Sequence, residues 1–174
     1  MTIPGHIETV SKLDAARRQL STAIDLWFND RDSVSTHALA YAAYDVIHTL
    51  SRKQGRKRSL LIDYDGVKDE HKKIFRDAVR RAGNYFKHAD RDPDEALQFN
   101  PVSNEIFIFF AILGVELMGL KINKVERTFI LWLCLNNPGW LTKEGRVMFS
   151  ENIPINTLSE LRNIPKQEFF QLCL

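Results

Sequence analysis

The sequence predicts an all-α protein, an up-down bundle of about five to seven helices with short helices at its C-terminus. Apolar residues recur at helical spacing in several long segments, and mostly short links join these segments. No convincing pair of strands accompanies them. We expect a single domain of 174 residues, with the main bundle in residues 1–137 and the short helices in residues 138–174 packed on it.

The first two expected helices have recognisable start and stop residues. The first runs over about 11–29, where Ser11 is a suitable N-cap. The second begins near Ser33 or Ser35 and stops at Gly55, because glycine suits the position just past a helix end.

Helices are also expected in the rest of the chain. The third covers about 67–89 and ends before Pro93, since the residue before a proline avoids the helical conformation. The fourth covers about 103–120, and its β-branched and aromatic content leaves a strand as the alternative. The fifth spans about 124–135, and Pro165 marks the start of the last one.

The second helix carries two different faces. One is a continuous apolar face made of Ala38, Leu39, Ala42, Ala43, Val46, Ile47 and Leu50. Opposite it lies a polar stripe made of His37, Tyr41, Tyr44, His48 and Arg52. Semi-polar aromatic residues are unusual on a solvated face, so we expect another helix, a subunit or a ligand to cover this stripe. Histidines that are half-buried and hydrogen-bonded across the bundle are the simpler interpretation, and a ligand role is the alternative.

The third helix repeats this layout with a stronger chemical character. Its expected core face consists of Phe75, Ala78, Val79, Ala82, Phe86 and Ala89. On the other side Asp77, Arg81, Asn84 and His88 recur every three or four residues, so their side chains stack along one side of the helix. Arg81, Asn84 and His88 are therefore the candidate catalytic residues. A solvated face held by an Asp77–Arg81 ion pair is the alternative.

Cations gather in the middle third of the chain. Residues 52–91 contain 13 Lys or Arg and 6 Asp or Glu, a net charge of +7, whereas the remainder contains 11 and 16, a net charge of −5. A basic region of this kind suits an anionic partner, and phosphate backbones are the commonest one. The candidate phosphate-binding residues are Lys72, Lys73, Arg76, Arg80 and Lys87, together with Arg52.

The stretch from Arg81 to His88 resembles the HEPN superfamily of helical bundles. The superfamily is marked by an arginine and a histidine, with about four to six residues between them, near the end of a bundle helix. In this sequence six residues lie between Arg81 and His88, and Ala82 occupies a position where a polar residue is frequent. Many members look like metal-independent ribonucleases that act as dimers, with the motif at the subunit interface. Other relatives bind nucleotides or proteins without catalysis. The resemblance implies RNA or a nucleotide as ligand and a homodimer as the assembly.

In the ribonuclease hypothesis, a ribose 2′-hydroxyl attacks the adjacent phosphorus. A histidine exchanges protons near neutral pH, so His88 is the candidate base, and a second His88 across a two-fold axis would supply the acid. Arg81 would hold the phosphate oxygens with its planar guanidinium, and Asn84 would orient His88 or the phosphate. Two other classes stay open: a module that binds RNA or a nucleotide without chemistry, and a scaffold or antitoxin-like partner of another protein.

Other kinds of site find no support in the sequence. Spacings typical of zinc sites, serine hydrolases and Gly-rich phosphate loops are missing, so we expect neither a metal nor another cofactor. Cys134 and Cys173 are expected to be buried free thiols. The longest apolar run, 106–115, is shorter than the roughly 18 residues of a membrane span, and residues 1–11 lack a secretory pattern. We therefore expect a cytoplasmic protein without a membrane partner.

Overall fold

The computed structural model describes residues 7–55, 60–88, 94–140, 143 and 155–174, and every regular element within them is helical. The all-α prediction is therefore confirmed. The α-helices are α1 (Lys12–Phe28), α2 (Ser33–Lys53), α3 (Lys72–Tyr85), α4 (Ser103–Leu117), α5 (Lys124–Asn136), α7 (Ile155–Asn163) and α8 (Lys166–Cys173). Short 3-10 helices are η1 (Leu61–Asp63), η2 (Asp69–His71) and η3 (Pro138–Trp140).

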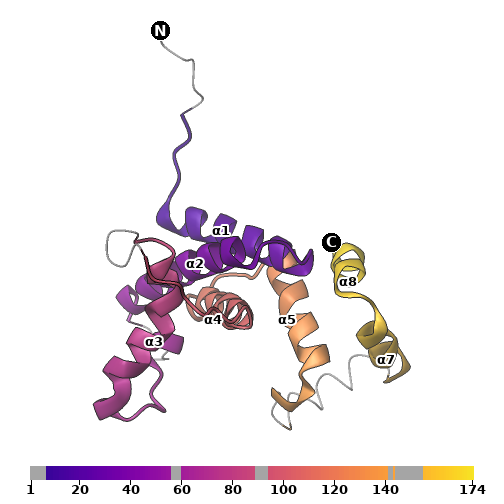
Figure 1. The fold of residues 1–174 in the computed structure, drawn as a ribbon. Helices are drawn as coiled ribbons and strands as arrows, with labels where there is room; N and C mark the ends of the chain where they lie inside the picture. Colours follow the sequence, from indigo (N-terminus) through magenta and orange to yellow (C-terminus); the bar gives the residue numbers. More distant parts are fainter. Residues whose placement is uncertain (1–6, 56–59, 89–93, 141–142, 144–154) are drawn as a thin grey trace.

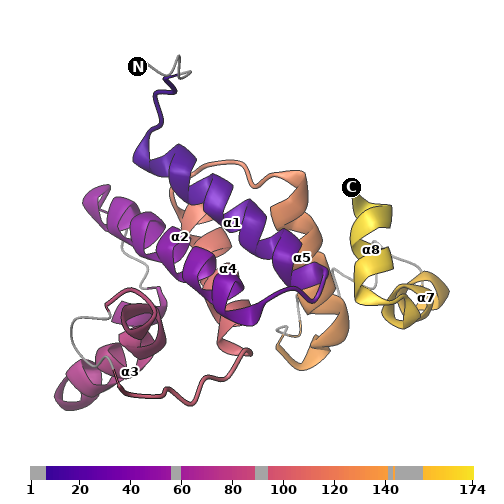
Figure 2. The ribbon, with the colours of Figure 1, turned by 45° about the horizontal axis from the view of Figure 1, so that its top comes forward.

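Helices α1, α2 and α4 form the centre of the bundle (Figure 1). The first two lie side by side and antiparallel, and α2 packs on α4 with its other side. Helix α3 lies at one end of this centre, whereas α5, α7 and α8 lie at the opposite end (Figures 1 and 2). The cationic helix α3 is thus held mainly by its few contacts with α2 and the neighbouring 3-10 helices.

Helices α1 and α2 begin and end where the sequence predicts. Ser11 Oγ accepts a hydrogen bond from the Asp14 N–H at 3.1 Å, and the Asp32 carboxylate accepts one from the Ser35 N–H at 2.7 Å. Helix α2 ends just before Gly55, whose φ of +70° is the left-handed conformation that glycine adopts at little cost.

Later helices follow the predicted order with small shifts in their ends. Helix α4 starts at Ser103 and is a helix rather than a strand, because its apolar residues pack on α2 and α1 around the helix rather than on two faces of a sheet. It ends at Leu117, and Ser103 is its first residue instead of its cap. Helix α8 begins directly after Pro165, as predicted. Residues 141–142 and 144–154 of the predicted C-terminal segment lie outside the described residues.

A buried ion pair fastens α5 to α1. Glu126 is fully buried, and its carboxylate lies 2.9 Å from the Arg17 guanidinium. The same carboxylate accepts a hydrogen bond from the Asn123 N–H at 2.7 Å, while the Asn123 side chain caps the helix in return. The buried carboxylate of Glu126 thus has both a cationic partner and a backbone hydrogen-bond donor, which a charged group inside a protein requires.

Aromatic stacking fastens α8 to the centre. The Phe170 ring stacks on Phe28 of α1, with 4.4 Å between ring centroids. Phe169 meets Trp132 of α5 edge-on at 5.0 Å. Both C-terminal phenylalanines are buried, so α8 completes the hydrophobic core at the end opposite α3.

The two faces of α2 differ from expectation, because the polar stripe is the more deeply buried one. Within the stripe only Arg52 is exposed, and the buried members are His37, Tyr41, Tyr44 and His48. Of the apolar face, Ala43 and Ile47 are buried and the others are half-buried. Since α2 lies between α1 and α4, both of its sides are covered by protein.

No helix in the described residues is both long enough and apolar enough to cross a membrane.

Helix α3 can approach α2 because it carries a glycine at the crossing point. A Cβ added to Gly83 would lie 2.3 Å from Cδ1 and 2.5 Å from Cγ of Tyr41. The ring atom Cγ is fixed close to the α2 backbone, so it cannot move aside without displacing one of the two helices.

We expect Gly83→Ala to loosen α3 and lower the free energy of unfolding by about 1–3 kcal/mol, because overpacking outweighs the gain in helix propensity. Urea denaturation measures the change. The matched control is Gly139→Ala, where an added Cβ meets no atom within 4 Å. A Gly83→Ala protein at least as stable as the unmodified chain would contradict the close crossing.

Candidate functional site

The three candidate catalytic residues line one hollow on the outer side of α3. Arg81, Asn84 and His88 share a hollow of about 520 Å³ whose other walls are Ile74, Asp77, Ala78, Tyr85 and Glu95. Arg81 and His88 are exposed, and Asn84 is half-buried between them. A guanidinium, an amide and an imidazole are thus presented together to solvent.

The helix that carries these residues is shorter than predicted, and His88 lies beyond its end. Helix α3 stops at Tyr85, and the next residues turn toward α2. The Phe86 ring meets His37 edge-on at 5.7 Å, and the Lys87 ammonium lies 4.6 Å from the Tyr41 ring centroid. The helix thus ends at Tyr85, well before Pro93, at which the sequence predicts its end.

Glu95 is the main residue of the hollow that sequence reasoning missed. Its carboxylate lies 3.3 Å from the Arg81 guanidinium, so Arg81 pairs with Glu95, whereas the alternative interpretation of this face had paired it with Asp77. The Tyr85 hydroxyl donates a hydrogen bond to the Glu95 carbonyl, which holds this loop segment over the end of α3. Nothing in the sequence pattern indicates this approach, because the contact depends on how the loop folds back.

The candidate phosphate-binding cations lie on or next to α3, with one exception. Between Lys72 and His88 there are six Lys or Arg and one Asp, a net charge of +5. Lys73 and Arg76 are exposed, while Lys72 and Arg80 are half-buried. Lys72 pairs with Asp69 at 2.6 Å, and the exposed Lys87 lies over Tyr41 as described above.

Arg52 is the exception, because it lies at the end of α2 and faces η1. Its guanidinium is 3.9 Å from the Asp63 carboxylate, which also lies 3.1 Å from His48 Nε2. Arg52 and His48 therefore share one carboxylate away from the hollow, and neither residue lines it. The backbone N–H of Ile62 donates to the Tyr44 hydroxyl at 2.9 Å, which fixes η1 to the same part of α2.

His37 is fully enclosed by protein. Its ring meets Phe99, Phe107 and Phe86 edge-on at 5.0–5.7 Å between centroids. Nδ1 lies 2.9 Å from Asn104 Oδ1, and the Asn104 amide nitrogen donates to the Ser33 carbonyl. This arrangement gives Nδ1 the proton, since Asn104 Oδ1 is an acceptor.

Burial lowers the pKa of His37 below its usual value of 6.5, and the nearby Lys87 ammonium lowers it further, against the opposing effect of the Asn104 hydrogen bond. His37 is therefore neutral at neutral pH. Both histidines of the stripe are buried rather than half-buried; His37 is hydrogen-bonded to Asn104, and His48 lies 3.1 Å from Asp63.

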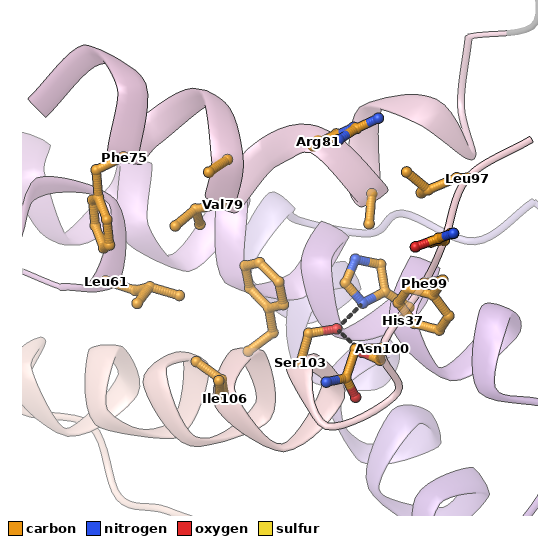
Figure 3. A pocket seen from close by; sticks show the side chains of 14 residues that line it. His37, Leu61, Phe75, Val79, Arg81, Leu97, Phe99, Asn100, Ser103 and Ile106 are labelled. Atoms are coloured by element: carbon orange, nitrogen blue, oxygen red, sulfur yellow. Dashed lines mark hydrogen bonds between the residues drawn. The ribbon is translucent and has the colours of Figure 1, made fainter. Parts of the chain in front are cut away.

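The expected core face of α3 lines a pocket instead of packing tightly. Ala78 is exposed, and Phe75, Val79 and Ala82 are half-buried. These four residues face α4 across a pocket of about 370 Å³ (Figure 3). Ala89, the last residue of the expected face, lies outside the described residues. Arg81 and Ala78 line both this pocket and the hollow.

In the part of the chain that the structure describes, no thiol lines the hollow, and its carboxylates and imidazole are not arranged as a metal site. Across the described residues, no group of three or more His, Cys, Asp or Glu side chains is placed to hold a metal ion. Cys134 and Cys173 are free and half-buried rather than fully buried. Burial raises the pKa of both thiols, which makes them poor nucleophiles.

Comparison with known proteins finds no matching family model, no matching curated protein and no matching solved structure.

We expect the neutral His37 to make stability depend on pH. Because its pKa is lowered in the folded state, the unfolded chain takes up a proton more readily, so the free energy of unfolding falls as the pH drops below 6.5. Denaturation curves between about pH 7 and pH 5 measure the slope. His37→Gln should flatten it, whereas Thr49→Gln, at an exposed position of the same helix whose side chain carries no titrating group, should leave it unchanged. Equal slopes in the His37→Gln variant and the unmodified chain would contradict the neutral buried imidazole.

Proposed function

We propose that this protein binds RNA through the hollow on α3 and cleaves it without a metal ion. The observation that carries the proposal is that Arg81, Asn84 and His88 line one hollow on the most cationic helix of the chain. A guanidinium beside an imidazole supplies the two things that cleavage at a ribose phosphate requires, a clamp for phosphate oxygens and a group that moves protons.

In this proposal the ribose 2′-hydroxyl gives its proton to His88 and attacks the neighbouring phosphorus. The P–O5′ bond breaks, the 5′ oxygen takes up a proton, and a 2′,3′-cyclic phosphate remains. Arg81 holds the charge that develops on the non-bridging oxygens, and Asn84, one turn away on the same helix, orients the phosphate or His88.

An incoming phosphate has to replace the Glu95 carboxylate at Arg81. The Arg81 and Glu95 side chains are 67% and 46% exposed, so water screens their attraction. Exposed ion pairs of this kind contribute only about 0–1 kcal/mol, which a phosphodiester, whose negative charge is shared by two non-bridging oxygens, offsets with a two-point contact to the guanidinium.

A homodimer would complete the reaction, because leaving-group protonation needs a second proton-moving group. Ile74 in the wall of the hollow is 69% exposed, so an apolar side chain lies open to solvent on the cationic face beside the candidate catalytic residues. Two copies that bury Ile74 against each other would bring their hollows together, with His88 of the second copy as the acid.

The same exposed Ile74 favours a second candidate function, a protein-interaction module without chemistry. There the α3 face would dock on another protein, as a scaffold or antitoxin-like partner does. Light scattering and the cleavage assay on the Ile74→Asp variant together distinguish the two functions. If the variant loses both the dimer and RNA cleavage, the ribonuclease is supported. If the unmodified chain is obtained only in complex with another protein and does not bind RNA, the interaction module is supported.

We expect cleavage of a labelled single-stranded RNA in EDTA, with cyclic-phosphate ends. His88→Ala should slow it about 100-fold or more, and Arg81→Ala by about 100- to 1,000-fold. The matched control is Arg127→Ala, an exposed arginine on α5 at the other end of the bundle. Full activity in either hollow variant would remove the proposed mechanism, and salt-dependent binding without any cleavage would leave RNA binding alone.

Glu95→Gln should strengthen RNA binding by up to about fivefold, because it removes the carboxylate that competes with phosphate for Arg81. Fluorescence anisotropy at fixed salt measures the dissociation constant, with Asp45→Gln on α2, outside the hollow, as the charge-matched control. Weaker binding by Glu95→Gln would argue that the loop, rather than Arg81, receives the RNA.

A further inference from the structure

A second concave site lies on the inner side of α3, separate from the phosphate hollow. The pocket of about 370 Å³ lies between α3 and α4 and is closed at one end by the segment that leads into α4. Its walls are mostly apolar, with Phe75, Val79, Phe99, Ile106 and Phe107 as the main apolar contributors. The polar residues of its lining are His37, Arg81, Gln98, Asn100 and Ser103. Pockets that hold small molecules have volumes of about 300–1,000 Å³, so this one has room for a compact ligand.

One polar group lines this apolar surface without a partner. His37 lies at the inner wall, with no exposed surface, and its Nε2 has no hydrogen-bond partner among the described residues. In Figure 3 one ring nitrogen faces Ser103, and the other points away from Ser103 toward the α3 side of the pocket. A buried polar atom left without a partner costs about 1–3 kcal/mol, which a ligand that pairs with it would recover.

The chemical character of that nitrogen follows from the groups on the other side of the ring. Asn104 Oδ1 lies 2.9 Å from Nδ1, and Ser103 Oγ lies 3.3 Å from it. The Ser103 hydroxyl already donates to the Asn100 carbonyl, so both groups present lone pairs to Nδ1 and require its proton. Nε2 is consequently a lone-pair acceptor, and only a hydrogen-bond donor satisfies it.

We propose that this pocket binds a small, neutral, mostly apolar ring compound that donates one O–H or N–H hydrogen bond to His37 Nε2. The aromatic walls favour a flat ring, which stacks or packs edge-on against phenylalanine. The apolar lining excludes ligands with several polar edges, because these would lose hydrogen bonds to water without replacement. Arg81 borders both this pocket and the hollow, whereas Asn84 and His88 line only the hollow, so a variant at either of those two positions tests the two sites separately.

Indole and benzofuran test the proposal as a matched pair, because they share one shape and only indole has an N–H donor. Titrations followed by amide chemical shifts should be carried into the millimolar range, since so small a ligand binds weakly. We expect indole to bind at least about fivefold more tightly than benzofuran, the contribution of one hydrogen bond. In His37→Phe, which keeps an aromatic ring and removes the acceptor, the two should bind equally.

Two further variants keep the test decisive if His37→Phe does not fold. Ile106→Trp, at a partly exposed position of the rim, should fill the pocket and abolish the binding of both compounds. His88→Ala, which alters only the hollow, should bind indole like the unmodified chain. Equal binding of the two compounds by the unmodified protein, no shift with indole, or a preference for indole that survives in His37→Phe would each overturn the proposal.

Discussion

The burial of polar side chains along α2 is the constraint on which the other elements depend. A helix covered on two sides would ordinarily be apolar all round, yet here His37, Tyr44 and His48 are inside the protein. Buried polar groups ordinarily have partners, and the contacts of these side chains come from later parts of the chain, although Nε2 of both histidines has no hydrogen-bond partner among the described residues. Asn104 of α4 accepts from His37, the backbone of η1 donates to Tyr44, and Asp63 lies beside His48. The stripe therefore fixes which segments can pack on α2 and in which register.

The same stripe also decides how α3 is presented. Tyr41 leaves room for α3 only where Gly83 lacks a Cβ, and its ring receives Lys87 just after the helix ends. With its inner side held at this crossing, α3 turns its cations and the hollow outward. Helix α3 contacts α2 at one crossing and faces α4 across the pocket. It therefore carries two concave surfaces on opposite sides, the solvent-facing hollow with Asn84 and His88 and the mostly apolar pocket that faces α4. Arg81 borders both.

Helix order, the N-cap of α1 and the end of α2 could be predicted from the sequence, because they depend on local signals such as Ser11 and Gly55. The grouping of Arg81, Asn84 and His88 was also predicted, although for His88 the reason was incomplete: it reaches the hollow from a turn beyond the helix end. Periodicity could not reveal the Glu95 contact or the pocket beside Ala78, since both depend on the path of a loop and on how closely two helices approach. Periodicity also could not show which face of α2 is more deeply buried, because other helices cover both sides of α2 and the amphipathic pattern then no longer separates a buried face from an exposed one.

The most direct test of this account is the protonation state of His37, which long-range ¹⁵N–¹H correlation spectroscopy of the labelled protein reports. The account predicts a neutral ring with its proton on Nδ1, and a ring that is still neutral at pH 6.5, the usual pKa of histidine. A proton on Nε2, or a ring already charged at that pH, would contradict it, because neither the contact with α4 nor an acceptor facing the inner pocket would then exist.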